Sequence, residues 1–383
     1  MYQYTNCVIC HKKGFFQCKQ CPSFVCSKEH LFLHNKNTHK DTNIPEKNNT
    51  NEINNDISKE IMIRMSNQDY STAITLINNH LNLLKQHNNY NLNNSTIIIE
   101  LLYTLGECHL NLSNLDQSKN ILNEIINLTE DLDNNINNTN TIQKIIFRQK
   151  ANMLLGAISL NLGEYNNSLK AYFSCENDLP KICKEPELNV KLSSVYFNIG
   201  LCYIYLGNKN IAEKYLKKAL AHTEGILGND VIHKLNADIF ENLGVVYELM
   251  NRFKDSLIFY KKSLKLKFNL YGEAHDEVLE LQYKISECYL SLKQFEQAEE
   301  ILGSIVELIL KEKINRASQE CIYRYSTYFY TYGVVLIKLN RLNNAKIYFN
   351  KVLEIVDGFL LPNDPWIINI NDLMKICDTK KIK

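Results

Sequence analysis

One spacing of small and bulky residues recurs six times along this chain and constrains its fold more than any other feature. Each copy begins with a small residue, which is Gly106, Gly156, Gly200, Gly244, Ser286 or Gly333. Twelve residues later comes a second small residue, which is Ser118, Ser168, Ala212, Ser256, Ala298 or Ala345. Four residues further on lies a bulky residue, which is Leu122, Tyr172, Leu216, Tyr260, Leu302 or Phe349. A register that holds through six copies predicts a repeat architecture.

The spacing fits a pair of antiparallel helices joined by a short turn. Small residues let two helices approach closely, and the bulky residue fills the space beside them. Turns such as Leu162-Gly163-Glu164-Tyr165 separate the two helical segments. We therefore expect the first small position to exclude Val by overpacking and to tolerate Ala, which is a good helix former.

This pattern resembles the tetratricopeptide repeat over residues 57–377. The resemblance implies an all-α fold, a tetratricopeptide-type α-solenoid with six clear units. Successive units start 50, 44, 44, 42 and 47 residues apart, which exceeds the usual repeat of about 34 residues and predicts longer helices or loops. A seventh, weaker unit precedes them, with Tyr70, Ala73 and Ile77 at the turn, small and bulky positions and Ile61 in place of the glycine.

Composition divides the chain into four zones. Residues 1–40 hold a cluster of Cys and His, and residues 41–56 form an Asn-rich segment that we expect to be a linker,. The helical repeats occupy residues 57–377, and residues 378–383 form a charged tail,.

Charge and hydropathy exclude two classes of partner. With 43 basic and 42 acidic residues, the chain lacks the overall positive field that draws proteins to nucleic acid. Its apolar stretches are shorter than the roughly 18 residues of a membrane span, and no signal peptide is evident, so no membrane partner is expected. Cysteines that are either paired in one cluster or scattered singly are typical of a reducing compartment, the cytoplasm or nucleus.

The N-terminal cluster predicts a metal site. It reads Cys7-x2-Cys10-x7-Cys18-x2-Cys21-x4-Cys26-x3-His30-x3-His34-x4-His39. Zinc takes four such ligands in a structural site, so eight ligands predict two structural zinc ions. Bound zinc would also explain how about 40 residues fold without a sizeable core.

The segment from Phe24 to His30 resembles the MYND and HIT zinc fingers, whose ligand pairs interleave. The resemblance implies that one zinc is bound by Cys7, Cys10, Cys26 and His30, and the other by Cys18, Cys21, His34 and His39. A MYND finger would have a further Cys where this chain has Asn43. The His34 and His39 pair is closer to HIT spacing, and a B-box finger is the third alternative.

No catalytic motif is found, so we expect a protein that is not an enzyme. Phosphate-binding loops, GxSxG and HExxH are all missing,. Methyltransferases with a split SET domain also join a MYND finger to tetratricopeptide repeats, but only a short linker separates the two here. A relative of that family without its catalytic domain is a remote alternative. Asn198 and Asn242 match one position of the chaperone-tail clamp of some tetratricopeptide domains, while Phe197 and Leu201 do not fit the others.

The domain order resembles the small MYND-finger and tetratricopeptide proteins of motile cilia, which are associated with inner dynein arms. That resemblance implies a cytoplasmic or axonemal adaptor that binds proteins through the concave face of the array and through the finger. The alternative is an assembly factor of the HIT-finger kind, which would act on nuclear or chaperone-linked complexes.

Overall fold

The chain is built from consecutive α-helices. A computed structural model describes residues 16–17, 24–25, 50–86, 92–130, 139–185, 187–223, 230–312 and 319–379. The helices are α2 (Thr50–Ser66), α3 (Tyr70–Gln86), α4 (Leu92–Asn111), α5 (Leu115–Asn127), α6 (Thr139–Asn161), α7 (Tyr165–Ile182), α8 (Glu187–Tyr205), α9 (Lys209–Thr223), α10 (Asp230–Leu249), α11 (Phe253–Tyr271), α12 (Asp276–Ser291), α13 (Phe295–Glu312), α14 (Gln319–Lys338), α15 (Leu342–Val356) and α16 (Pro365–Thr379). Two strands, β1 (Phe16–Gln17) and β2 (Phe24–Val25), pair antiparallel.

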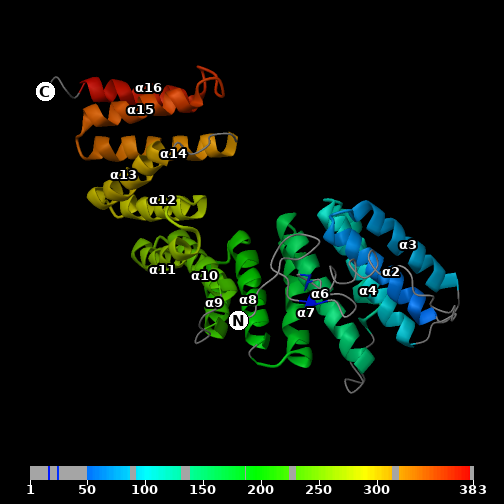
Figure 1. Cartoon of the computed structure of the whole chain (residues 1–383). Coiled ribbons are helices and arrows are strands. Elements are labelled where there is room, and N and C mark those ends of the chain that lie inside the picture. Colours follow the sequence, from blue (N-terminus) through cyan, green and yellow to red (C-terminus); the bar gives the residue numbers. More distant parts are fainter. Residues whose placement is uncertain are drawn as a thin grey trace. The chain divides into compact units, whose positions relative to one another are not determined.

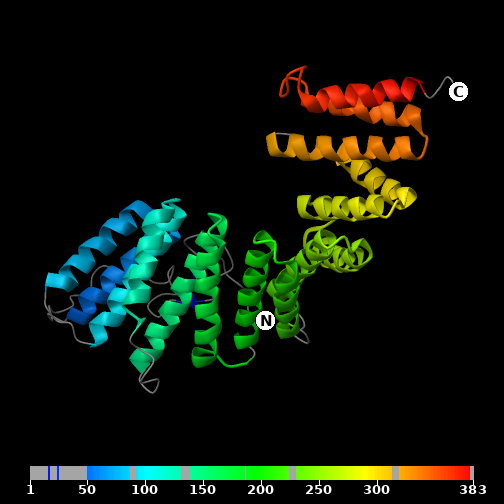
Figure 2. The same cartoon turned by 180° about the vertical axis from the view of Figure 1, so that it is seen from behind.

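The chain divides into two compact units, Met1–Phe147 and Arg148–Lys383, with the division inside α6. In the first unit α2 packs against α3, and α4 packs against α5. In the second unit the packed pairs are α8–α9, α10–α11, α12–α13 and α14–α15, and α16 packs against α15 (Figure 1). The view from behind also shows α14, α15 and α16 side by side (Figure 2). The predicted helix pairs are thus confirmed, and α16 is an additional helix after the last pair.

The small and bulky positions meet as the sequence predicts. A Cβ atom added to Gly200 would lie 2.8 Å from Leu216 Cγ, and one added to Gly333 would lie 2.7 Å from Phe349 Cε1. At Gly244 an added Cβ would overlap the ring of Tyr260. The expectation that Ala is tolerated is therefore wrong at Gly244, because the added carbon is too close to the aromatic ring unless the ring or the helix shifts,. Gly106 is different, since its added Cβ would meet Leu122 at an ordinary 3.4 Å.

The turn inside each helix pair repeats in backbone conformation. One residue per pair has positive φ, and these residues are Gln68, Ser113, Gly163, Gly207, Asn251, Lys293 and Asn340. The residue after each of them donates its N–H to a carbonyl five residues earlier, as Asn208 does to Tyr203. This bond closes the first helix with a left-handed residue, the arrangement that favours glycine. Gln68 lies in the weak first copy, which therefore has the same turn as the others.

Polar contacts between neighbouring pairs follow the same register. The Cys202 thiol lies 3.2 Å from Ser168 Oγ, and Ser256 Oγ lies 3.4 Å from Cys288 Sγ in the equivalent place. Within pairs, Ser118 and Ser168 each donate a hydrogen bond of 2.8 Å to the carbonyl of the glycine twelve residues earlier. These buried bonds connect the close-approach positions of the two helices and fix their register.

Two predicted boundaries differ from the structure. α2 begins at Thr50, inside the segment that was expected to be a linker up to residue 56. Ile53, Ile57 and Ile61 continue a four-residue apolar spacing into that segment, and this spacing accounts for the longer helix despite its many asparagines. α16 ends at Thr379, two residues into the predicted tail.

Candidate protein-interaction surface

The first helices of the repeats present a row of half-buried and exposed side chains. The row consists of the residues three before, one after and five after each small position. We call these the first-helix face; they are Phe197, Leu201, Tyr205, Glu241, Val245, Leu249, Tyr283, Glu287, Ser291, Tyr330, Val334 and Lys338. Residues four apart on a helix lie on one side of it. Tyr205 is 61 % exposed and Leu249 is 42 % exposed, although both are large apolar residues.

A charged cluster lies in the middle of this row. Glu241 accepts a 2.6 Å hydrogen bond from Lys267 of α11 and another of 2.6 Å from Lys284 of α12. Lys267 also pairs with Glu277 at 2.8 Å, and Lys284 pairs with Glu280 at 3.1 Å. The cluster joins three helices of two neighbouring pairs, and its Lys267 side chain is only 6 % exposed.

Burial and charge act in opposite directions on the cluster. Burial raises the pKa of the Glu241 carboxyl, but Lys284 and Lys267 outweigh it and hold that pKa below its usual value. Burial lowers the pKa of Lys267, and its hydrogen bonds to Glu241 and Glu277 more than reverse this effect. Burial also lowers the pKa of Lys284, and the charge of Glu241 helps to outweigh this effect. Glu241, Lys267 and Lys284 are therefore charged at neutral pH, so the cluster is a set of buried ion pairs.

Glu287 also lies on the first-helix face, but the surroundings of its carboxyl shift its pKa in the opposite direction to that of Glu241. Burial raises the pKa of its carboxyl, and a hydrogen bond from Tyr283 only partly offsets that rise. The neighbouring Glu248 accepts a 2.6 Å bond from the Tyr260 hydroxyl. In this part of the face the carboxylates of Glu241, Glu277, Glu280 and Glu287 outnumber the ammonium groups of Lys267 and Lys284.

No local sequence pattern indicates this cluster directly. A usable signal exists, because Glu241 and Lys284 are 43 residues apart, close to one repeat interval. Residues at such a separation lie at matching places on neighbouring first helices.

The two asparagines of the clamp comparison bond to the backbone of their own helices. Asn198 donates its side-chain N–H to the carbonyl of Ser194, and Asn242 donates to that of Asp238, each at 2.9 Å. Both bonds are to the asparagine's own helix, four residues back. The absence of a chaperone-tail clamp stays a prediction.

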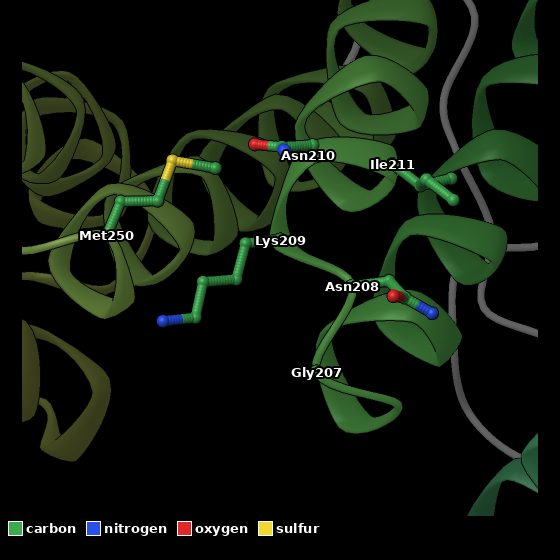
Figure 3. A pocket seen from close by; sticks show the side chains of 6 residues that line it. All are labelled: Gly207, Asn208, Lys209, Asn210, Ile211 and Met250. Carbon is green, nitrogen blue, oxygen red and sulfur yellow. The ribbon is translucent and has the colours of Figure 1, made fainter.

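A hollow of about 400 Å³ lies where two repeats meet, lined by Gly207, Asn208, Lys209, Asn210, Ile211 and Met250. Lys209 extends from the start of α9 toward the end of α10 (Figure 3) and donates a hydrogen bond to the carbonyl of Leu249. Tyr165 and Tyr205 occupy the equivalent places one repeat earlier, and their rings stack at 5.1 Å. The hollow therefore belongs to a joint between repeats.

The buried thiols are poorly suited to nucleophilic chemistry. Burial raises the pKa of the Cys108 and Cys288 thiols to about 11. A thiol needs a lowered pKa to react as a thiolate at neutral pH. These cysteines are core side chains.

The predicted zinc ligands Cys7, Cys10, Cys18, Cys21, Cys26, His30, His34 and His39 all lie outside the described residues. Among the residues that the structure does describe, no group of three or more His, Cys, Asp or Glu side chains is placed to hold a metal ion. In the same part of the chain, no helix has the length and hydropathy needed to cross a bilayer.

Comparison with known proteins identifies the repeats. Tetratricopeptide-repeat models match residues 235–310 and, with a second model, residues 99–132, 193–221 and 326–355. These stretches cover most of the pairs α10–α11 and α12–α13, α4–α5, α8–α9 and α14–α15. The helix pairs are tetratricopeptide repeats, and the fold is a tetratricopeptide-type α-solenoid, a class that generally serves as a non-enzymatic scaffold. No zinc-finger family model matches the chain.

A curated relative is the clustered mitochondria protein homologue of Candida albicans, which is 25 % identical over 179 residues. The match covers 46 % of this chain and 12 % of the relative, so the chain corresponds to a small part of that protein.

Solved structures show the same fold at low identity. The apo form of RapI has a TM-score of 0.57 and 15 % identity, with 86 % of each chain covered. A tetratricopeptide protein of Cytophaga hutchinsonii has a TM-score of 0.52 and 13 % identity, covering 82 % of this chain and 98 % of that one. BtubC of P. vanneervenii has a TM-score of 0.51 and 14 % identity, covering 65 % and 94 %.

Proposed function

We propose that this protein is a non-enzymatic scaffold that binds partner proteins through the first-helix face of its repeats. The observation that supports this proposal most directly is the row of exposed apolar and charged side chains on α8, α10, α12 and α14. Large apolar side chains such as Tyr205 and Leu249 remain exposed there at equivalent positions of successive repeats. Exposed aromatic and aliphatic side chains beside charged groups are typical of protein-binding surfaces.

Affinity capture with the full chain tests this proposal. Tyr205→Ala combined with Leu249→Ala should reduce capture of the proteins that the wild-type chain retains. The matched control is Leu310→Ala with Ile347→Ala, which removes exposed apolar side chains from the second helices α13 and α15. Equal capture by both double variants would rule out the first-helix face as the docking surface.

The proposal includes an N-terminal finger that binds two structural zinc ions. Cys7, Cys10, Cys26 and His30 would hold one ion, and Cys18, Cys21, His34 and His39 the other. The bound ions would supply folding free energy to a segment of too few residues for its own core. The finger is the second proposed site of protein contact.

The cellular setting that the finger-and-repeat resemblance supports is the cytoplasm or the axoneme, as an adaptor of inner dynein arms. A nuclear assembly factor of the HIT-finger kind is the alternative, and the name of the Candida albicans relative adds mitochondria as a third location to examine. A tagged copy at native expression level should localise to the axoneme of a ciliated cell. Localisation to the nucleus or to mitochondria would contradict the ciliary assignment and leave the scaffold proposal standing.

A further inference from the structure

Basic residues gather on two second helices of the array. α9 contains four lysines and one glutamate, and α11 contains five lysines and one aspartate. The net charge of the whole chain is only +1. The neighbouring helices α12 and α13 are acidic, with nine carboxylates and two lysines between them. The positive charge is therefore segregated along the array.

Lysines on these helices lie over aromatic rings, and the arrangement repeats. Lys218 lies 4.7 Å from the ring centroid of Tyr196 and 5.1 Å from that of Tyr215. One repeat later, Lys262 lies 5.5 Å from Phe240 and 5.6 Å from Phe259. Both lysines are 18 residues after the first small position of their repeat. The stems cover the rings, and cation–π attraction holds the ammonium groups above them.

The preceding lysines reach the next repeat in the same way. Lys217 lies 5.9 Å from the ring of Tyr247 in α10, and Lys261 lies 5.4 Å from that of Tyr289 in α12. The rings of Tyr247 and Phe259 stack at 5.2 Å. A continuous set of rings therefore connects Lys217 with Lys262. We call Lys217, Lys218, Lys261 and Lys262 the lysine face.

Few carboxylates neutralise this surface. Lys217 pairs with Glu213 at 2.6 Å, and Lys218 lies 3.7 Å from Glu176. In the described part of the chain, no carboxylate oxygen lies within 4 Å of the ammonium groups of Lys261, Lys262 or the exposed Lys214, Lys254 and Lys265. Isolated surface lysines are common, but here ring-held lysines recur at fixed positions of two consecutive repeats. Such lysines lose less side-chain freedom when they bind an anion.

We propose that the lysine face binds an acidic segment of a partner protein, with apolar residues between the acidic ones. Ile211 is 40 % exposed and Ile258 is 51 % exposed on the same two helices, and they offer contacts for the apolar residues. Single-stranded nucleic acid binds by stacking its bases on open rings, whereas these rings lie beneath lysine stems. Insertion into a membrane interface likewise uses aromatic groups that are free to insert. The inference rests on the proposed scaffold function and adds a second docking surface with a defined charge.

Fluorescence anisotropy with the full chain tests the proposal. The probe is a short fluorescein-labelled peptide of repeating Glu-Glu-Leu, with a Gln-Gln-Leu peptide as its neutral counterpart. The acidic peptide should bind, the neutral peptide should not, and added salt should weaken the binding. Replacing the four lysines of the lysine face by Gln should weaken it about tenfold, the combined effect expected of four exposed ion pairs.

Two matched variants complete the test. Lys59, Lys293, Lys311 and Lys375 are exposed lysines outside both proposed docking faces, and their replacement by Gln makes the same change in net charge but should leave binding within about twofold. Replacing the lysine face by Arg keeps charge and ring contact and should retain binding. Equal binding of the acidic peptide by the Gln variant and wild type overturns the proposal. So does a wild-type chain that ignores the peptide but binds phosphatidylserine vesicles or single-stranded RNA. Neither result affects the capture experiment on the first-helix face.

Discussion

At the scale of single residues, the glycines of the first helices differ in how much space faces them. Gly244→Ala should destabilise the protein by about 1–3 kcal/mol, because the new methyl group overlaps the Tyr260 ring and forces overpacking,. Urea unfolding monitored by circular dichroism measures the change. Gly106→Ala is the control, since its Cβ has room beside Leu122, and it should be neutral or stabilise by up to about 1 kcal/mol. Equal behaviour of the two variants would contradict the packing described here.

The left-handed turn residues give a second test at this scale. Gly207 has φ of +76° and nothing within 4 Å of an added Cβ, so Gly207→Ala probes backbone strain alone. It should cost about 1 kcal/mol. Lys293, at the equivalent turn with φ of +58°, should show the reverse effect when replaced by Gly, a gain of up to about 1 kcal/mol. Thermal melts of both variants measure the two effects. A stabilising effect of Gly207→Ala would contradict this interpretation of the turns.

At the scale of elements, the helix pairs and their register could be predicted from the sequence, since small and bulky residues must face each other for helices to pack. The turns were easiest to predict where glycine occupies the left-handed position. Ser113, Lys293 and Asn340 adopt the same conformation without that signal, because the flanking helices fix where the turn must close. The start of α2 at Thr50 was missed because asparagine-rich composition outweighed a four-residue apolar spacing.

The candidate site was predictable only in outline. Repeat spacing indicates which residues share the first-helix face, but not that Lys267 reaches Glu241, because Lys267 comes from the end of a second helix. The lysine face could not be predicted for the same reason. Its lysines are visible in the sequence, but the aromatic rings that they contact come from three or more different helices. Ion pairs and ring contacts across helices are set by tertiary packing and have no local sequence signal.

Glu287 links this surface to pH. Burial raises the pKa of its carboxyl, so the folded state binds that proton more tightly than the unfolded chain does. Its favourable contribution is present at acidic pH and is lost as the pH rises through the raised pKa. Glu287→Gln should therefore raise the melting temperature at pH 7 more than at pH 4. Differential scanning calorimetry across that range checks the sign, with exposed Glu296→Gln as control. A larger gain at acidic pH would be incompatible with the described burial.

At the scale of the whole molecule, the proposed finger makes a countable prediction. Native mass spectrometry of the full chain should show two zinc ions, and a chelator should remove both while most helical circular dichroism remains. His34→Ala with His39→Ala should leave one ion. A wild-type chain with a single zinc would mean that these two histidines are not ligands.

The central claim is that the chain is an array of helix pairs stabilised by contacts between neighbours. Hydrogen exchange on Gly244→Val tests it most directly, because this substitution overpacks the α10–α11 pair. In a repeat array the damage spreads to adjacent pairs and fades beyond them. Protection should fall from α8 to α13 and remain close to wild type in α4 and α5. Unchanged protection in α10 and α11, or a uniform loss that includes α4 and α5, would contradict the repeat architecture proposed for this protein.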